Sequence, residues 1–409
     1  MTKAALHIAL CLAVATSHLY AQAAEQTGAA RDERWRDDLK VFAKELPARH
    51  INAFARIPRA TFDREVATLD SAIPHLTDSQ IRLRFVRLTA LLGDGHTNVA
   101  LPPYDVRLPV ALLWTDDGPA IVNADSTNAR LIGAMITAVN GRPIAEVADT
   151  LRRYIPHENE LGFRISPGAL LLRPGALRDM GLGGDSVSTQ LTVTRDGKSW
   201  DSRVVAVRAA GFTLPMPATL PLHRQHPGER YWWTYVPNDR LVYIKYNRCE
   251  DTQAFKRLVD NAMAAIDSVK PLRVVVDVRD NSGGDSRVVQ PLIEALRARP
   301  DVNRKDALFA IMGRATFSSG LFAANDVRTR THATLVGEPS GERANHYGEL
   351  GVFKLPNSGL AISYSTKLHK LVEGDGESFA PDVLAPPTAA AYIAGRDPAM
   401  EWILAHARR

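Results

Sequence analysis

The chain has 409 residues, of which 45% are hydrophobic and 23% are charged. This length and apolar content allow two or three domains with packed cores, and the composition excludes a disordered chain and a membrane protein. The net charge is +5 with basic residues scattered among acidic ones, so we expect no nucleic-acid partner.

Residues 1–23 have the layout of a cleavable secretory signal, with Lys3, an apolar run and a small-residue site, "AQA". Cleavage there removes Lys3 and takes the net charge from +5 to +4. Cys11 leaves with this segment, and Cys249 alone cannot form an intrachain disulfide. No later stretch approaches the roughly 18 apolar residues of a membrane span. We predict an exported protein, periplasmic or secreted, with no metal motif and no cofactor.

Residues 24–104 predict an N-terminal helical region. Its clearest signal is one apolar helical face with spacings of four, three and four: Ile81, Phe85, Leu88 and Leu92. Gly93 ends this helix, and the loop "DGHT" follows with His96 near its centre.

Residues 105–210 predict a β-rich region. Short strand-like segments surround a helical stretch at 144–154, and they lie at 120–125, 134–141, 189–197 and 202–207. Asn140-Gly141 and Asp196-Gly197 are turn signals. Residues 211–240 are rich in Pro, His and Trp, and we interpret them as a connector.

From residue 241 to the end, strand and helix patterns alternate. Strands are predicted at 241–246, 273–278, 307–313 and 333–337, and helices at 252–269, 286–298 and 319–328. The segment "RVVVDV" is apolar enough to be a central strand. This alternation predicts a sheet with helices packed on it.

Two of the predicted strands end in unusual loops. After 273–278 comes "RDNSGGDSR", in which Gly283-Gly284 precede a helix, as in an anion-binding turn or an ordinary strand-to-helix turn. After 307–313 comes "RATFSSG", in which Ser318 and Ser319 begin a helix as a nucleophile or as N-caps. Side by side in one sheet, these loops would supply a nucleophile and oxyanion donors.

The order of motifs resembles a known family. "LVYIKYNRCED", "LRVVVDVRDNSGGDS", "TFSSGLFAAND", "TLVGEPSGERANHYGE" and "FAPDV", preceded by "LLGDGHT", occur in the order seen in the C-terminal-processing and tricorn-core serine peptidases. This resemblance implies an α/β fold: a ClpP/crotonase-like βα core at 241–409, with the N-terminal helical region and a PDZ-like insert at 105–210. Such an insert binds extended peptide by strand addition.

The resemblance implies roles for individual residues. Ser318 matches the nucleophile, and the N–H groups of Ser319 and of Gly283 or Gly284 match the oxyanion hole. The C-terminal-processing branch uses a lysine about 25 positions after the serine, where this chain has Arg343. Arginine does not lose its proton at any working pH, so we expect Arg343 to hold a substrate carboxylate or a neighbouring acid.

The tricorn-like branch uses a histidine as the base, and His96 matches its position. His346 in "NHYGE" is the alternative, either as base or as a substrate-binding residue. The carboxylate that orients the histidine is expected at Glu373, and the alternatives nearby or upstream are Asp375, Glu377 and Glu349.

The sequence therefore predicts an exported serine endopeptidase that acts on peptides or unfolded proteins. The alternative is a non-catalytic protein of the same fold that binds peptide or a hydrophobic ligand, because the family also resembles interphotoreceptor retinoid-binding protein. Cleavage specificity and oligomeric state are left open by the sequence.

Overall fold

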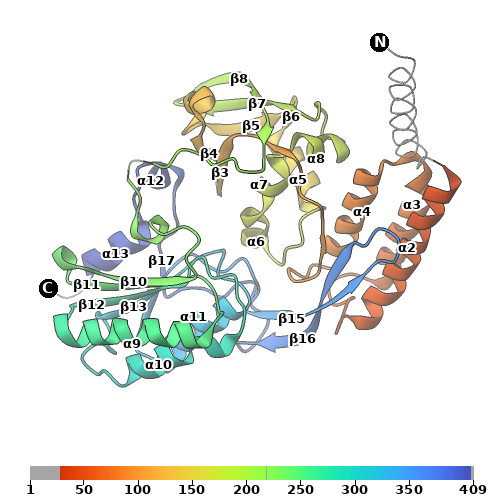
Figure 1. The fold of residues 1–409 in the computed structure, drawn as a ribbon. Helices are drawn as coiled ribbons and strands as arrows, with labels where there is room; N and C mark the ends of the chain where they lie inside the picture. The colour runs from red at the N-terminus through yellow and green to blue at the C-terminus, as the bar shows by residue number, and fades with distance from the viewer. Residues whose placement is uncertain (1–27, 218, 407–409) are drawn as a thin grey trace, which may run out of the picture.

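The structure is a computed structural model that describes residues 28–217 and 219–406, so the predicted signal at 1–23 lies outside the described residues. Helices come first in the described chain, a β-rich middle region follows, and a mixed sheet with helices ends it (Figure 1). Within these residues, no helix combines the length and apolar character needed to cross a membrane.

Helices α2 (Ala29–Arg49), α3 (Arg59–Ala72) and α4 (Asp78–Ala90) pack together. Helix α4 begins with a capping box between Thr77 and Gln80, which satisfies N–H groups that have no intrahelical acceptor. It stops before Gly93, which has a φ of 66°. The predicted apolar face is at most 3% exposed, so this helix is confirmed.

A long β-hairpin from the C-terminal part of the chain packs against the N-terminal helices. Strands β15 (Asn345–Lys354) and β16 (Ala361–Lys370) pair antiparallel, and β1 (Asn98–Ala100) pairs with β16. Figure 1 shows this hairpin running from the mixed sheet to the N-terminal helices. Its side chains Phe353, Ile362 and Tyr364 complete the apolar core of those helices. The pairing of β1 with β16 brings the loop that carries His96 toward the C-terminal part of the chain.

The middle region is a sheet with short helices beside it. Its strands lie in the order β3 (Val110–Thr115), β4 (Gly118–Ala124), β5 (Met135–Val139), β7 (Ser188–Arg195) and β8 (Lys198–Val205), with β6 (Arg142–Pro143) against β5. Its helices are α5 (Ile144–Arg152), α6 (Glu160–Ile165), α7 (Pro167–Leu171) and α8 (Pro174–Asp179), and β2 (Val106–Arg107) pairs with β9 (Val207–Arg208). The predicted turns are present, since Asn140 and Asp196 have φ of 50° and 52° before their glycines.

The largest C-terminal sheet has the order β10 (Tyr231–Val236), β11 (Leu241–Tyr246), β12 (Arg273–Asp277), β13 (Leu308–Met312), β14 (Thr334–Gly337) and β17 (Val383–Leu384). All neighbours are parallel except β10, an antiparallel edge strand. The sheet therefore begins inside the segment 211–240 that the sequence indicated as a connector. Prolines and histidines before "YWWTYV" and a proline directly after it hide this short strand from a pattern search.

Helices cover both faces of this sheet. On one face lie α9 (Thr252–Val269), α10 (Gln290–Arg297) and α11 (Ser319–Arg330), and on the other lies α13 (Pro398–His406), with α12 (Ala389–Ile393) near the edge (Figure 1). Strands β11, β12 and β13 are buried along their whole length. The predicted α/β core, a sheet with helices packed on it, is confirmed.

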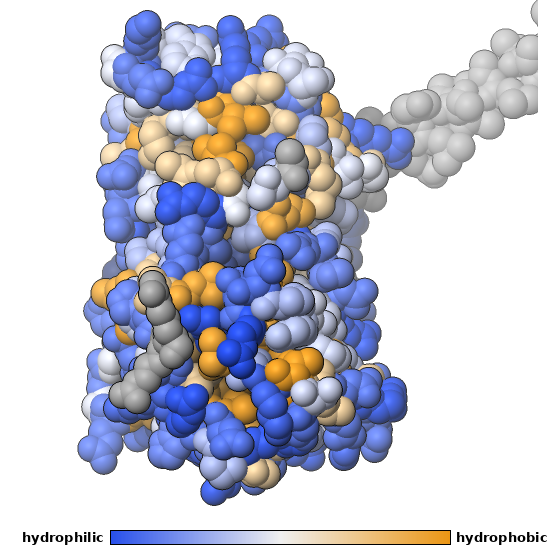
Figure 2. Space-filling view, turned by 90° about the vertical axis from the view of Figure 1, so that its left-hand side faces the viewer, coloured by the Kyte–Doolittle hydropathy of each residue, from blue (hydrophilic) through white to orange (hydrophobic). Residues whose placement is uncertain are grey.

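The face of the molecule that lies on the left-hand side of Figure 1 has no single extended apolar surface. Figure 2 shows apolar residues there in separate patches divided by hydrophilic ones. Scattered exposed apolar side chains are ordinary on globular proteins.

Candidate active site

Ser318 lies at the turn between β13 and α11. Its φ of 55° and ψ of −127° place a non-glycine residue in a strained conformation. In α/β-hydrolases a strained strand-to-helix turn presents the nucleophile. Ser318 is the N-cap of α11, yet its side chain makes no capping hydrogen bond. The hydroxyl is thus not used to cap the helix, and Ser318 lines a cavity of about 520 Å³.

Ser319 has a different environment. Its Oγ donates to the carbonyl of Gly284 at 2.6 Å, which ties the start of α11 to the loop after β12. Its N–H lies in the first helical turn, where N–H groups have no intrahelical acceptor. Of the two serines, Ser318 has the free hydroxyl, and Ser319 offers an N–H beside it.

The loop after β12 offers a second free N–H group, which belongs to Gly284 and not to Gly283. The Gly283 N–H donates to Oδ1 of Asn281 at 2.9 Å. Cys249 and Gly284 form an isolated parallel β-bridge, in which the Gly283 carbonyl and the Asp285 N–H bond Cys249. The N–H and carbonyl of Gly284, which lies between them, therefore point to the opposite side. Gly284 and Ser319 both line the cavity with Ser318. This geometry favours the N–H groups of Gly284 and Ser319 as oxyanion donors.

Gly283 itself packs against the serine. A Cβ added there would lie 2.8 Å from Cβ of Ser318, and φ is already 100°. We expect Gly283→Ala to displace Ser318 and to lower the rate of serine modification by about 100-fold, on the scale of a disturbed oxyanion hole. Gly228→Ala is the matched control, since its φ is 90° and nothing lies within 4 Å. Equal rates for the two variants would contradict this expectation.

The loop that carries His96 is held by buried hydrogen bonds. Oδ2 of Asp94 accepts from His50, Thr97 and Ser365, and Oδ1 accepts from the His96 N–H. Burial raises the pKa of Asp94, but these hydrogen bonds outweigh it and the pKa is lowered. The His96 carbonyl accepts from Ser363 on β16. The backbone of the histidine is thus fixed on both sides.

The imidazole of His96 lines the same cavity as Ser318. It stacks on Phe317 with ring centroids 4.4 Å apart. Burial lowers its pKa to about 4, against the opposing charge of Asp94. The ring is therefore neutral at pH 7, which is the form that accepts a proton.

Glu342 is the carboxylate beside this imidazole. Its Oε1 lies 3.3 Å from Nδ1 of His96, and its Oε2 accepts the Ser318 N–H at 2.5 Å. Glu342 is fully buried. Burial, and then the charge of Glu158, hold its pKa well above the ordinary value. One carboxyl group thus contacts both the histidine and the backbone of the serine.

The other residues expected at the site lie at different distances from it. His346 on β15 donates Nδ1–H to the Arg343 carbonyl at 3.2 Å, and its Nε2 lies 3.7 Å from Glu342. The Arg343 guanidinium pairs with Asp375. Of the alternative acids, Glu349 lines the cavity and lies 3.5 Å from Lys367, whereas Glu373 and Glu377 are exposed in the segment between β16 and β17.

Sequence reasoning missed two residues that the geometry brings to the centre. Glu342 immediately precedes Arg343, which drew attention as the counterpart of the family's lysine. Asn281 is fully buried; its Oδ1 accepts the Gly283 N–H and its Nδ2 donates to the Tyr246 carbonyl. These bonds fix the loop after β12, residues 279–285, which we call the oxyanion loop. A polar residue inside "RDNSGGDS" was the only signal for Asn281.

Three groups at and beside His96 could together offer ligand atoms to a metal ion. Among the described residues, Asp94, His96 and Glu158 bring ligand atoms within 4.8 Å of one another. The hydrogen bonds that Asp94 accepts already compensate its charge.

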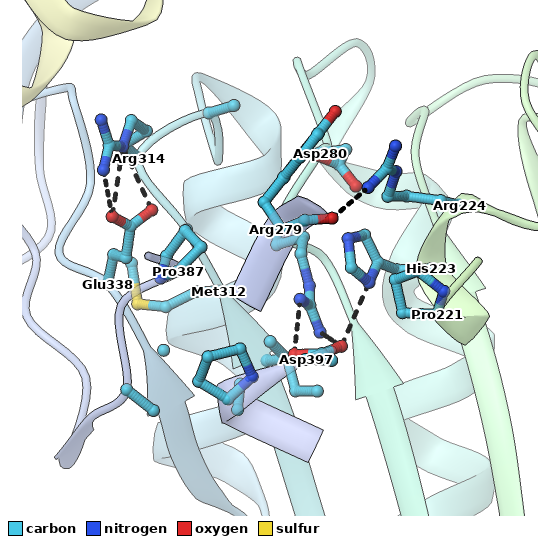
Figure 3. Close-up of a pocket in the computed structure, with 18 of the residues that line it drawn as sticks. Pro221, His223, Arg224, Arg279, Asp280, Met312, Arg314, Glu338, Pro387 and Asp397 are labelled. Carbon is cyan, nitrogen blue, oxygen red and sulfur yellow. Dashed lines mark hydrogen bonds and ion pairs between the residues drawn. The ribbon is translucent and has the colours of Figure 1, made fainter. Parts of the chain in front are cut away.

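A second cavity of about 190 Å³ lies under the same strand ends. Figure 3 shows Arg279 paired with Asp397, and Arg314 paired with Glu338. Arg279 begins the oxyanion loop, and Arg314 precedes the serine turn. These ion pairs hold the starts of the two loops that carry Gly284 and Ser318.

Arg279 is expected to matter for stability. It bonds Asp397 through two nitrogens at 3.0 and 2.9 Å and lies 2.8 Å from Asp277. Burial raises the pKa of Asp397, but the Arg279 charge outweighs it and holds that pKa below its ordinary range.

Arg279→Ala removes the guanidinium that pairs with both carboxylates and leaves Asp277 with Lys245 and Asp397 with His223. We therefore expect a loss of about 3 kcal/mol in the free energy of unfolding, measured with urea. Arg297→Ala, whose partner Glu294 is exposed, is expected to cost less than about 1 kcal/mol. Equal losses would contradict this role of the Arg279 ion pairs.

Comparison with solved structures supports the architecture. Mature CPAF complexed with lactacystin aligns with a TM-score of 0.62 and 12% identity over 91% of this chain and 97% of that chain. Mature CPAF gives 0.62 and 13% over 91% and 96%. A putative peptidase from Parabacteroides merdae gives 0.46 and 13% over 92% and 96%. The two CPAF alignments show that the chain has the fold of CPAF. No protein-family model and no curated protein matches its sequence.

Proposed function

We propose that the protein is an exported serine endopeptidase, with Ser318 as nucleophile, His96 as general base and Glu342 as the acid that orients it. One observation carries the proposal. Ser318, whose hydroxyl caps no helix, lines a cavity together with His96, and Glu342 contacts both residues.

The reaction follows from these positions. Nε2 of His96 takes the Oγ proton as Oγ bonds the substrate carbonyl carbon. The N–H groups of Gly284 and Ser319 bind the oxyanion. The imidazolium then gives its proton to the leaving amine, and the peptide C–N bond breaks to leave an acyl ester on Ser318. A water, deprotonated by His96, hydrolyses that ester and restores the serine.

Glu342 supports both proton transfers. We assign Oε1 as the acceptor of Nδ1–H of His96 in the complex with substrate, which leaves Nε2 free to face Ser318. The 3.3 Å separation is longer than a good hydrogen bond, as is frequent before substrate binds. Because burial and the Glu158 charge raise the pKa of Glu342, its ionised form becomes populated only at a higher pH than for an ordinary carboxylic acid. That ionised form stabilises the imidazolium, so the same contact serves acylation and deacylation.

The substrate class is an extended peptide or an unfolded protein. Its recognition would involve the middle region, which we propose is a PDZ-like domain that adds a peptide strand to its sheet. The cavity beside Ser318 mixes polar residues with Phe317, Phe322 and Leu350. This lining fits a peptide better than it fits a purely hydrophobic ligand, so the carrier alternative is not favoured.

Hydrolysis of an unstructured protein tests the function. We expect purified mature protein to convert casein to peptides, with new amino termini that increase with time. The control is the same preparation after treatment with a fluorophosphonate. Casein that stays intact with folded, untreated protein, while a set of unstructured peptides also stays intact, would contradict the proposal.

A further inference from the structure

A segment of the middle region forms part of the wall behind Glu342. Nδ2 of Asn159 donates to the Ser340 carbonyl at 3.2 Å and to the Glu377 carbonyl at 2.7 Å. Gly162 packs directly on Gly341, since a Cβ on Gly162 would lie 2.2 Å from the Gly341 oxygen. The start of α6 therefore rests on the loop that carries the acid.

Glu158 lies at the edge of this contact and joins two loops of the site. Its Oε1 accepts the Gly95 N–H at 3.2 Å, and its Oε2 accepts the Arg343 N–H at 2.9 Å. Gly95 directly precedes His96, and Arg343 directly follows Glu342. One carboxylate thus holds the backbone beside the base and the backbone beside its acid.

We propose that Glu158 is a positioning residue that ties the His96 loop to the Glu342 loop, and that its negative charge makes the site sensitive to pH. Glu158 comes from the middle region. That region therefore contributes a residue to the active site, in addition to any surface on which it binds peptide. The positional half of the proposal stands on the two hydrogen bonds alone. The pH half rests on the proposed function.

The charges around Glu342 set the sign of the pH effect. Burial raises the pKa of Glu158 to about 7, the Asp94 charge adds to this, and N–H donors with the Arg56 charge oppose it. The Glu158 charge in turn raises the pKa of Glu342. The titratable or charged groups near these two carboxyls lie on both sides of the middle region in the chain: Arg56, Asp94 and His96 before it, and Arg343 and His346 after it.

Removing the Glu158 charge should therefore make Glu342 ionise at lower pH. The rate of serine modification needs ionised Glu342 and neutral His96, so its acid limb should move to lower pH in Glu158→Gln. The amide of that variant keeps one acceptor oxygen and replaces the other by a donor, so one of the two N–H groups loses its partner. The plateau rate should fall as a result.

Hydrogen exchange tests the tie without any activity. In Glu158→Ala, the amides of Gly95 and Arg343 should both exchange faster, by about tenfold, because both lose a partly buried acceptor. Glu160→Gln is the matched control, because Glu160 is two residues away, exposed, and paired with Arg152 and Arg164. Faster exchange at neither amide, or at only one, would overturn the tie.

The pH profile tests the second half. Fluorophosphonate labelling rates are measured from pH 4 to 9 for wild type, Glu158→Gln and Glu160→Gln. The proposal is supported if the acid side of the pH–rate profile moves to lower pH in Glu158→Gln and not in Glu160→Gln. Profiles that superimpose on their acid side in all three proteins overturn it. A wild type that does not label contradicts the proposed function instead and overturns the pH half with it, while the exchange result still decides the tie.

Discussion

Ser318→Ala is expected to lower kcat for peptide hydrolysis by about 10⁶-fold, the scale seen when a serine nucleophile is removed from a triad. The reason is chemical, because no other described hydroxyl occupies its position. Oγ of Ser319 is bonded to the Gly284 carbonyl. The measurement is kcat on an unstructured peptide with purified variant and wild type in parallel.

The variant should remain folded. The Ser318 hydroxyl caps no helix, and its backbone is equally strained with alanine, so the free energy of unfolding should change by less than about 1 kcal/mol. Ser319→Ala serves as the comparison, since it removes the tie to Gly284 but keeps the nucleophile. A Ser318→Ala protein with near wild-type kcat would contradict the assignment of the nucleophile.

Glu342→Gln is expected to lower kcat by about 10⁴-fold, or roughly 5 kcal/mol of transition-state stabilisation. The Ser318 N–H requires an acceptor, so the amide oxygen of Gln should take the place of Oε2. The amide NH₂ then faces Nδ1 of His96 and donates to it. This fixes the proton on Nε2, the tautomer that cannot accept from Ser318.

The choice between acids follows from the same assay. Glu373→Gln changes an exposed side chain in the segment after β16, and we expect it to keep most of the activity. Glu349→Gln changes the cavity wall, so its effect should appear mainly in KM. A large loss of kcat in Glu373→Gln with normal kcat in Glu342→Gln would contradict the assignment of Glu342 and favour the acid expected from the resemblance.

The sequence predicted the α/β core well because its periodicity is strong there. The predicted helix at 252–269 coincides with α9, and the strand at 273–278 contains β12. Both elements are buried on the expected faces, since packing against a continuous sheet selects an apolar pattern. The turn that carries Ser318 could be located for the same reason, as it follows a strand and begins a helix.

The parts that sequence reasoning missed depend on contacts between distant segments. The hairpin β15–β16 reaches the N-terminal helices, and this pairing brings the His96 loop near Glu342. Nothing near Glu342 in the chain distinguishes it from a solvated loop acid. Its burial comes from α6 and the histidine loop, which lie far away in sequence, so only the fold reveals it.

Mapping the fluorophosphonate adduct is the most direct test of the central claim, that an activated serine sits beside His96 and Glu342. Wild-type protein is labelled, digested and analysed by mass spectrometry that separates Ser318 from Ser319. We predict one adduct, on Ser318, formed at a rate that falls sharply in His96→Ala and in Glu342→Gln. An adduct on Ser319, or labelling of Ser318 at an equal rate in those variants, would contradict the account.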